Sequence, residues 1–172
     1  MTYTTQYTSS IGILTLASDG KHLTGLWIEG QKYFGSTLKK PIIQNGETPV
    51  LQAAKKWLDN YFSGECPSPS LLPIILDGTL FQKEVWSILL TIPYGETMTY
   101  GAIASTIASN RGIKSMSAQA VGNAVGKNPI SIIVPCHRVI GNDGQLTGYA
   151  GGIDRKHWFL AHENKTYLKK LR

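Results

Sequence analysis

The heptapeptide VPCHRVI, residues 134–140, places a thiol, an imidazole and a guanidinium in consecutive positions. Cysteine reacts as the thiolate, and a thiol with the ordinary pKa of about 8.5 needs a neighbouring base to ionise at neutral pH. An extended backbone would direct Cys136 and His137 to opposite sides, which disfavours a direct contact between them. His137 could instead act through a bridging water, or a distant histidine could serve as the base. The best-placed acidic group to orient such a base is Glu163.

Cys136 could have two roles other than that of a nucleophile: a metal ligand or a core residue. A zinc site needs several cysteines or histidines at short spacing, but the two cysteines lie far apart, the four histidines are scattered, and neither CxxC nor HExxH occurs. We therefore expect no metal ion and no other cofactor. Cys136 could also be an ordinary core residue. Its polar neighbours and the glycine-rich segment 141–152 leave this alternative and the catalytic one equally open, whereas Cys66 is expected to be non-catalytic.

Composition restricts the class of protein. The 172 residues are 42% hydrophobic and 16% charged, as in an ordinary globular protein. Two cysteines are too few for a disulfide framework, and the first ten residues lack the regions of a signal peptide. No apolar run approaches the ~20 residues of a membrane span. We therefore expect a cytoplasmic protein that has no membrane partner.

The charge is unevenly distributed along the chain. Residues 1–78 carry six Lys and no Arg against six Asp and Glu, whereas residues 79–172 carry seven Lys and four Arg against five Asp and Glu. The whole net charge of +6 therefore lies in the second half. A basic half favours a polyanionic partner, although a solvated basic face without a partner would have the same composition.

The first half has the pattern of a small sheet. Residues 2–10, 12–18 and 23–30 are rich in β-formers and predict three strands. The dipeptide Asp19-Gly20 is a hairpin signal between the second and third strands. We therefore expect an antiparallel arrangement at the start of the chain.

A helix and a linker follow this sheet. Thr48 is a candidate N-cap, and Pro49 suits the first helical position. Apolar residues then recur at helical spacing through Phe62, and Gly64 is placed to end the helix. The segment CPSPSLLP, residues 66–73, contains three prolines and therefore predicts a linker.

The second half predicts short helices. The first begins at the cap Thr79, continues through Leu90 and stops before Pro-Tyr-Gly. Thr99 opens a second helix over 99–108. A polar loop, 109–114, separates it from a third helical stretch.

The third helical stretch, 115–126, consists almost entirely of small residues with weak helix propensity. Such a helix suits a surface that lies close against something large. Two short helices joined by a turn fit a helix-turn-helix that approaches DNA, while a tight helix–helix contact explains the same composition. The apolar run 130–134 predicts a buried strand that delivers Cys136, and a last helix is expected over 154–163.

The segments AVGNAVGKNP, IIVPCHRVIG and GYAGGIDRKHWFLAHE resemble the O6-alkylguanine-DNA alkyltransferase (methylated-DNA–protein-cysteine methyltransferase) family, most densely over residues 79–172. The resemblance implies an α+β fold. Residues 1–73 would form a ribonuclease-H-like α/β domain that ends in the linker. Residues 74–172 would form a mainly helical, winged-helix-like domain with a helix-turn-helix. The implied partner is double-stranded DNA, bound through the minor groove by a protein that is a monomer in solution.

The resemblance also implies roles at the reactive centre. Cys136 would accept the alkyl group of O6-alkylguanine in an irreversible, single-turnover reaction after the nucleotide is flipped out of the duplex. His137 would act as a base through a water and be oriented by Glu163. Asn128 would tie the helix-turn-helix to the active-site segment. Tyr100 would turn the phosphate of the flipped nucleotide and donate toward guanine N3.

Further contacts follow from the same resemblance. The carbonyls of Cys136 and Val139 would accept from the exocyclic amine, and the N–H of Ala150 would donate to O6. The substrate pocket would also include Tyr149, Gly151 and Lys156. The residues expected at the DNA are Thr99, Ser117, Ala118, Gln119, Ala120, Gly122 and Arg138. Arg138 is expected to be structural rather than catalytic.

The sequence departs from the family pattern at three places. Gln119 stands where the family usually has an arginine that fills the gap left by the flipped base, so it should hold that space less firmly. The loop 109–115 is longer than usual, and Ser131 replaces a proline that lines the pocket in some members. Two other functions stay open: a non-enzymatic sensor of alkyl damage, although such relatives lack the cysteine, and a cysteine hydrolase with repeated turnover.

Overall fold

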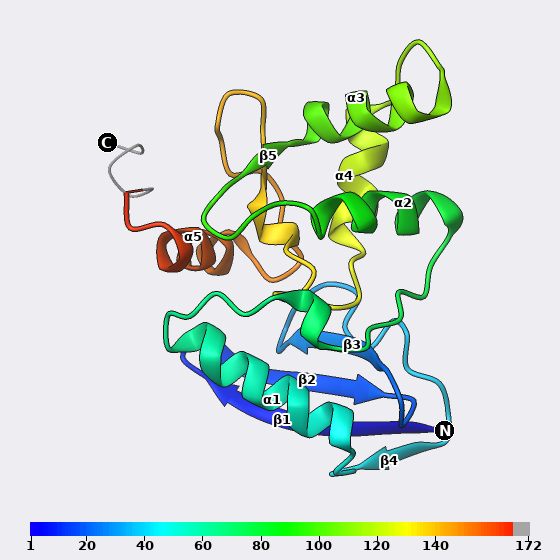
Figure 1. Cartoon of the computed structure of the whole chain (residues 1–172), viewed down its shortest axis with the longest axis vertical. Helices are drawn as coiled ribbons and strands as arrows, with labels where there is room; N and C mark the ends of the chain where they lie inside the picture. Colours follow the sequence, from blue (N-terminus) through cyan, green and yellow to red (C-terminus); the bar gives the residue numbers. More distant parts are fainter. Residues whose placement is uncertain (167–172) are drawn as a thin grey trace. The chain divides into compact units, whose positions relative to one another are not determined.

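The computed structural model describes residues 1–166, and the chain folds into two compact units (Figure 1). Unit 1 consists of Met1–Asp77 and Pro129–Ile133. Unit 2 consists of Gly78–Asn128 and of the chain from Val134 onward. Strands dominate the first unit and helices the second, so the predicted α+β class is confirmed.

Unit 1 is built on a four-stranded sheet with the order β3-β2-β1-β4 (Figure 1). Its strands are β1 (Thr2–Ser9), β2 (Gly12–Ser18), β3 (Leu23–Ile28) and β4 (Ile42–Gln44). β2 pairs antiparallel with both β1 and β3, and β4 pairs parallel with β1. The predicted turn between β2 and β3 is closed by the N–H of Asp19, which donates to the carbonyl of His22 at 3.2 Å. The sequence missed β4, because three exposed residues carry no periodic signal.

Helix α1 (Pro49–Phe62) packs on β1 and β2 and begins where the sequence predicted (Figure 1). The hydroxyl of Thr48 accepts from the N–H of Leu51 at 3.3 Å, and Gly64 follows the helix in a left-handed conformation with φ of 100°. Leu58, a residue of α1, is fully buried. Its replacement by alanine would cost about 2–5 kcal/mol of unfolding free energy.

The proline-rich segment 66–73 is an irregular connection that contains one turn of 3₁₀-helix, η1 (Pro69–Leu71). The indole of Trp57 in α1 donates to the carbonyl of Ser68 at 2.9 Å, which fastens the connection to the helix. Cys66 lies exposed in the same segment.

The apolar run 130–134 is not the strand that the sequence predicted. Only its first residue pairs, as an isolated parallel bridge to Leu26 of β3. Leu26 donates to the carbonyl of Pro129 and accepts from the N–H of Ser131, both at 2.9 Å. Ile132 then adopts a positive φ of 72°, which turns the chain away from the sheet direction. The run is apolar because all of it is buried, and burial gives a turn the same composition as a strand.

Within residues 1–166, unit 2 contains four helices and a short parallel ladder. The helices are α2 (Leu80–Leu89), α3 (Tyr100–Arg111), α4 (Ala118–Gly126) and α5 (Ile153–Glu163), and the ladder joins β5 (Met98–Thr99) to β6 (Val139–Ile140). The predicted caps are formed: Thr79 accepts from the N–H of Gln82 at 3.1 Å, and Thr99 from that of Ala102 at 3.0 Å. No helix in the described residues is both long enough and apolar enough to cross a membrane.

The connection between α3 and α4 lies later in the chain than predicted. α3 continues through Arg111 into the expected loop 109–114, and Gly112 ends it in a left-handed conformation with φ of 65°. The following helix begins after Ser117, whose hydroxyl accepts from the N–H of Ala120 at 3.1 Å. The side-chain cap therefore decides the start of α4, and the residues before it are not helical.

One face of α4 explains part of its unusual composition. Ala124 is buried, and its carbonyl accepts a hydrogen bond of 2.8 Å from the indole of Trp86 in α2. The tight helix–helix contact that the sequence allowed is therefore present on this face. The other face, formed by Ala118, Gln119 and Asn123, is exposed to solvent.

Candidate active site

Cys136 lies in a single turn of 3₁₀-helix, η2 (Cys136–Arg138), so the extended backbone that would separate Cys136 from His137 is not present. Its N–H donates to the carbonyl of Val134 at 2.8 Å, and its own carbonyl accepts the N–H of Val139. Successive side chains of such a turn point about 120° apart, since it has three residues per turn. Cys136 and His137 are therefore not held on opposite sides, and both are buried.

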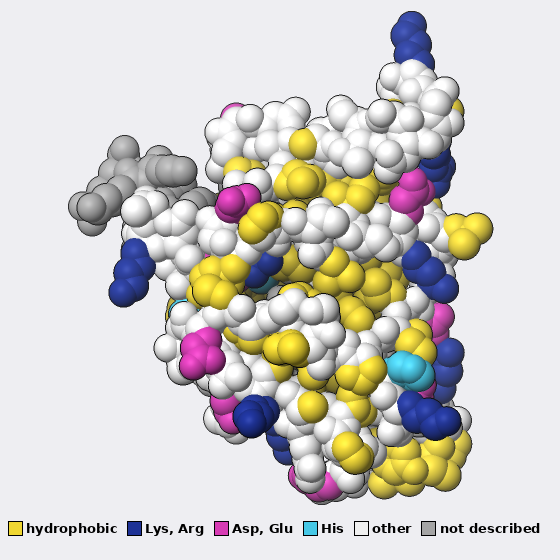
Figure 2. Space-filling view, viewed as in Figure 1, with side chains coloured by type: hydrophobic (Ala, Val, Ile, Leu, Met, Phe, Trp, Pro, Cys, Tyr) yellow, Lys and Arg dark blue, Asp and Glu magenta, His cyan; other side chains and the backbone are white. Residues whose placement is uncertain are grey.

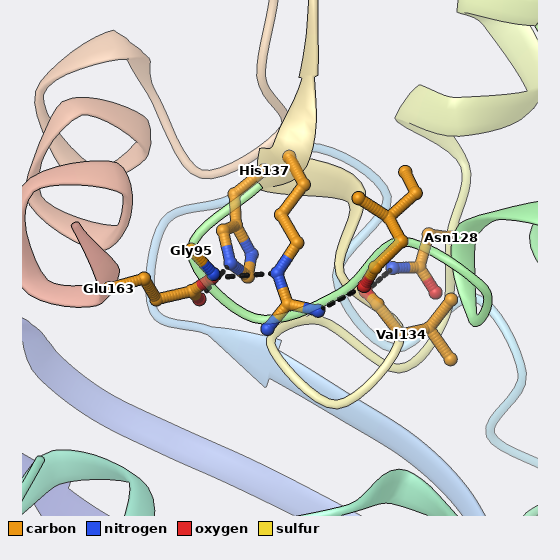
Figure 3. A network of polar contacts seen from close by, with 7 residues as sticks. Gly95, Asn128, Val134, His137 and Glu163 are labelled. Atoms are coloured by element: carbon orange, nitrogen blue, oxygen red, sulfur yellow. Dashed lines mark hydrogen bonds and ion pairs between the residues drawn. The ribbon is translucent and has the colours of Figure 1, made fainter. Parts of the chain in front are cut away.

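The side chains of His137, Arg138 and Glu163 form a buried network around η2 (Figure 3). Glu163, the last residue of α5, lies with Oε2 at 2.5 Å from Nε2 of His137 and with Oε1 at 2.6 Å from Nε of Arg138. The N–H of Gly95 also approaches Oε1, at 3.4 Å. Arg138 is fixed at its other end, where Nη1 donates to the carbonyl of Ile92 at 2.7 Å. The network joins η2, α5 and the turn after α2.

The charges of this network fix the proton positions. Burial alone would raise the pKa of the Glu163 carboxyl, but His137 and Arg138 together hold that pKa below its ordinary value. Burial lowers the pKa of His137 despite the attraction of Glu163. Glu163 is therefore ionised and can only accept, so the neutral imidazole donates from Nε2. Nδ1 is buried, has no hydrogen-bond partner in the described part of the chain, and is left as the basic nitrogen.

Groups from other elements affect the pKa of the Cys136 thiol. Burial raises the pKa of the Cys136 thiol, while the Asn128 amide and the charge of Lys156 act in the opposite direction. Asn128 also donates from Nδ2 to the carbonyl of Val134 at 2.8 Å, which ties the end of α4 to the segment that enters η2 (Figure 3). Because burial is the largest of these effects, the thiol is the resting form at neutral pH, and a base is needed to produce the thiolate.

Lys156 fastens the glycine-rich loop to α3. It is fully buried, and Nζ lies 3.1 Å from the carbonyl of Thr147, 3.3 Å from that of Gly148 and 3.4 Å from the hydroxyl of Tyr100. The Tyr100 hydroxyl itself donates to the Thr147 carbonyl at 3.1 Å. Burial lowers the pKa of Lys156 to about 8. The ammonium group of Lys156 therefore donates its hydrogen bonds mainly to this loop.

The same loop carries Tyr149 and Ala150. Burial and the nearby Cys136 raise the pKa of Tyr149 well above its ordinary value. The N–H of Ala150 donates to no group among residues 1–166, whereas the carbonyl of its neighbour Gly151 accepts from Arg155 at 3.3 Å. Within the same range, no three His, Cys, Asp or Glu side chains come together as metal ligands.

Comparison with known proteins places this arrangement in a family. A model of the 6-O-methylguanine DNA methyltransferase DNA binding domain matches residues 80–165, and a model of the ribonuclease-like domain of the same proteins matches residues 2–76. The chain belongs to the 6-O-methylguanine DNA methyltransferase family.

Individual relatives agree with this family along nearly the whole chain. A methylated-DNA–protein-cysteine methyltransferase of Haemophilus influenzae is 39% identical over 168 residues, covering 98% of this chain and 89% of that protein. One from Mycobacterium leprae is 45% identical, covering 95% and 93%. The crystal structure of Mycobacterium tuberculosis OGT in complex with DNA matches with a TM-score of 0.81 at 42% identity, covering 99% of both chains.

The residues of this methyltransferase that are expected at the DNA differ in their exposure to solvent. Ser117, Ala118 and Gln119 are exposed at the start of α4, Ala120 and Gly122 are half-buried behind them, and Thr99 caps α3. The side chain of Arg138 is buried and forms an ion pair with Glu163, so its predicted contact with DNA stays a prediction that the burial of the guanidinium does not favour. These contacts fit the expectation that Arg138 is structural rather than catalytic.

Other residues of the site were missed or misplaced from sequence. The carbonyl of Ile92 and the N–H of Gly95 complete the buried network, and Asn164 donates to the carbonyl of Gly95 at 3.0 Å. The Pro-Tyr-Gly turn was a usable signal, because Gly95 has a φ of 81° and an added Cβ would lie 3.2 Å from the Glu163 carbonyl. Ser131, expected at the pocket, instead donates within unit 1 to Gln31 at 3.2 Å.

Proposed function

We propose that this chain repairs O6-alkylguanine, mainly O6-methylguanine, in double-stranded DNA by transferring the alkyl group to Sγ of Cys136. The observation that carries the proposal is the buried thiol of Cys136 beside a neutral His137, whose Nε2 is engaged by ionised Glu163 and whose Nδ1 is unoccupied. Relatives named methylated-DNA–protein-cysteine methyltransferases support the substrate class.

The reaction proceeds by one displacement. Nδ1 of His137 takes the thiol proton through a bridging water, and ionised Glu163 stabilises the resulting imidazolium. The thiolate then attacks the alkyl carbon, so that an S–C bond forms while the C–O6 bond breaks and its electron pair passes to guanine, which takes up a proton. Water does not cleave the resulting thioether, and the exposed Cys66 is in the other unit. Each molecule therefore reacts once.

The target base has to leave the helix for this attack, because the alkylated O6 cannot be reached within the stack. The N–H of Ala150 then donates to O6, and the carbonyls of Cys136 and Val139 accept from the exocyclic amine. The Cys136 carbonyl already accepts one bond and retains a second lone pair. Tyr100, held by Lys156, turns the phosphate of the flipped nucleotide and donates toward N3.

α3 and α4 act together as a helix-turn-helix whose second helix enters the minor groove. That groove is only about 6 Å wide, which suits the small exposed residue Ala118 and the half-buried Gly122. Gln119 occupies the space that the flipped nucleotide leaves, without a fixed charge. A monomer in solution and a cytoplasmic location stay predictions of the sequence.

The test is the intact mass of the protein after incubation with a duplex that contains O6-methylguanine. We expect wild-type protein to gain one CH2 per molecule and Cys136→Ala to gain none. Cys66→Ala is the matched control, since that cysteine is exposed, and it should react like wild type. Running the same assay with an O6-benzylguanine duplex measures how bulky an alkyl group is accepted.

The other outcomes separate the alternatives. Tight binding to the damaged duplex without a gain in mass would overturn the proposal and favour a damage sensor. A gain that persists in Cys136→Ala would overturn the assignment of the nucleophile. Repeated turnover of an acyl substrate would favour a hydrolase.

A further inference from the structure

The α3–α4 connection, residues 112–117, is held by hydrogen bonds at both of its ends. The N–H of Gly112 donates to the carbonyl of Ser109 at 3.2 Å, and the N–H of Ile113 donates to that of Ala108 at 3.0 Å. These bonds and the left-handed Gly112 close the end of α3, while Ser117 caps the start of α4. Hydrogen bonds therefore fix both ends of the connection, and Lys114 lies three residues before the cap of α4.

Two basic side chains near this connection have different surroundings. Arg111 is engaged: its guanidinium donates to Glu84 at 2.6 Å and lies 5.7 Å from the ring centre of Phe81. Lys114 is exposed and forms no ion pair or hydrogen bond in residues 1–166. In Figure 2 a basic side chain projects into solvent from the turn between α3 and α4.

The segment that follows Lys114 and contains α4 carries no charge. The whole stretch 115–126 contains no charged residue, and its basic neighbours in sequence are Lys114 before it and Lys127 after it. A duplex that lies against the exposed face of α4 brings a phosphate charge every ~1.7 Å along its axis. The helix itself offers no cation to balance these charges, so the balancing charges have to come from its flanks.

We infer that Lys114 binds a phosphate of the duplex and positions the first turn of α4 on the DNA. This inference rests on the proposed function and extends it to a residue outside the helix-turn-helix surface expected from sequence. The match of residues 80–165 to a DNA binding domain and the DNA complex of a 42% identical neighbour point to a duplex as the ligand of this unit. Lys114 contributes position and affinity and takes no part in the chemistry at Cys136.

A phosphate contact leaves a specific mark on the salt dependence of binding. Each neutralised phosphate contributes a slope of about −0.9 to the logarithm of the binding constant against the logarithm of salt concentration. Loss of the Lys114 contact should therefore reduce the slope by about one, uniformly for damaged and undamaged duplexes. Equivalently, the affinity advantage of wild type over the variant should shrink about threefold between about 50 and 200 mM salt.

The experiment measures fluorescence anisotropy of a labelled, undamaged duplex with wild type, Lys114→Ala, Lys114→Arg and Lys21→Ala across a salt series. Lys114→Ala should show the smaller slope, and Lys114→Arg should keep the wild-type slope because it retains the charge. Lys21→Ala is the matched control in the β2–β3 turn of unit 1 and should behave as wild type. All four proteins should gain one CH2 from excess O6-methylguanine duplex.

Different results overturn different claims. A Lys114→Ala slope equal to that of wild type overturns the phosphate contact, whatever the methyl transfer. An equal reduction in Lys21→Ala also overturns it, since the effect would then be one of general charge. Failure of wild type to take up a methyl group overturns the proposed function instead, and the mass measurement on the same samples distinguishes these cases.

Discussion

The buried network of His137, Arg138 and Glu163 and the exposed face of α4 position their side chains in opposite ways. In the network, Glu163 is bonded to His137 and Arg138, and its side chain is only 1% exposed. On α4, the side chain of Gln119 is exposed and makes no hydrogen bond to another side chain or loop within the described residues. One region satisfies its polar groups inside the protein, and the other leaves them for a partner.

This difference fits the role proposed for each region. A base that acts on a buried thiol needs one proton position, and buried charges hold it only when each is compensated. A DNA-binding face gains from groups that are unpaired before binding, because a group already paired has to give up its partner. Substitutions in the network should therefore change both rate and stability, while substitutions on α4 should change affinity alone.

The largest effect is expected from removal of the base. His137→Ala should slow methyl transfer by about 10²–10⁴-fold, which is the usual contribution of a general base. The rate is measured in a single turnover at saturating duplex. His162→Ala is the matched control on α5, where that ring stacks on Trp158 at 4.7 Å between centroids, and it should react at nearly the wild-type rate. A fall of only severalfold for His137→Ala would contradict its role as the base.

Two ion pairs test the contrast in stability. Arg138→Met leaves the buried Glu163 uncompensated and should lower the unfolding free energy by about 3–5 kcal/mol. Arg111→Met breaks the pair with Glu84, in which the arginine side chain is 41% exposed, and should cost about 0.2–1 kcal/mol. Urea unfolding of both variants measures the difference. Equal losses would show that burial does not decide how much stability is lost when an ion pair is broken.

A smaller and pH-dependent effect is expected at Lys156. Its charge lowers the pKa of the Cys136 thiol and holds the glycine-rich loop, so Lys156→Met should slow methyl transfer severalfold at neutral pH. The folded-state pKa of Lys156 is about 8, so wild type itself loses this charge as the pH rises through that value. The ratio of wild-type to variant rate should therefore shrink above about pH 8. A ratio that stays constant across that pH would argue that the loop contacts alone matter.

The smallest effect on stability is expected at Gln119. Gln119→Ala should change the unfolding free energy by less than about 0.5 kcal/mol, as is usual for an exposed residue without partners. It should weaken binding to a duplex with a flipped, damaged base more than binding to an undamaged duplex. Anisotropy titrations with the two duplexes measure this. Equal weakening on both would mean that Gln119 does not fill the vacated space.

Local chemistry made much of the fold predictable. Thr48, Thr79 and Thr99 were predicted as helix caps because a hydroxyl followed by helical spacing satisfies backbone N–H groups within three residues. The β2–β3 turn was predicted from Asp19-Gly20 because this dipeptide tolerates the positive φ of a tight hairpin turn, and Gly20 has a φ of 100°. The start of α4 was misplaced because two serines, Ser115 and Ser117, precede the helix and only the second caps it.

The sequence by itself predicted which groups would carry the chemistry: the thiol of Cys136, the imidazole of His137 and the carboxylate of Glu163. Tertiary structure alone decided how they are arranged. It placed Cys136 in a 3₁₀ turn, directed Arg138 into the interior, and buried Lys156 under a loop. The chemistry that a group could perform can be inferred from the residue types present and from their local spacing. The proton positions depend on burial and on contacts between residues some 25 or more positions apart, such as His137 and Glu163, which a local pattern does not contain.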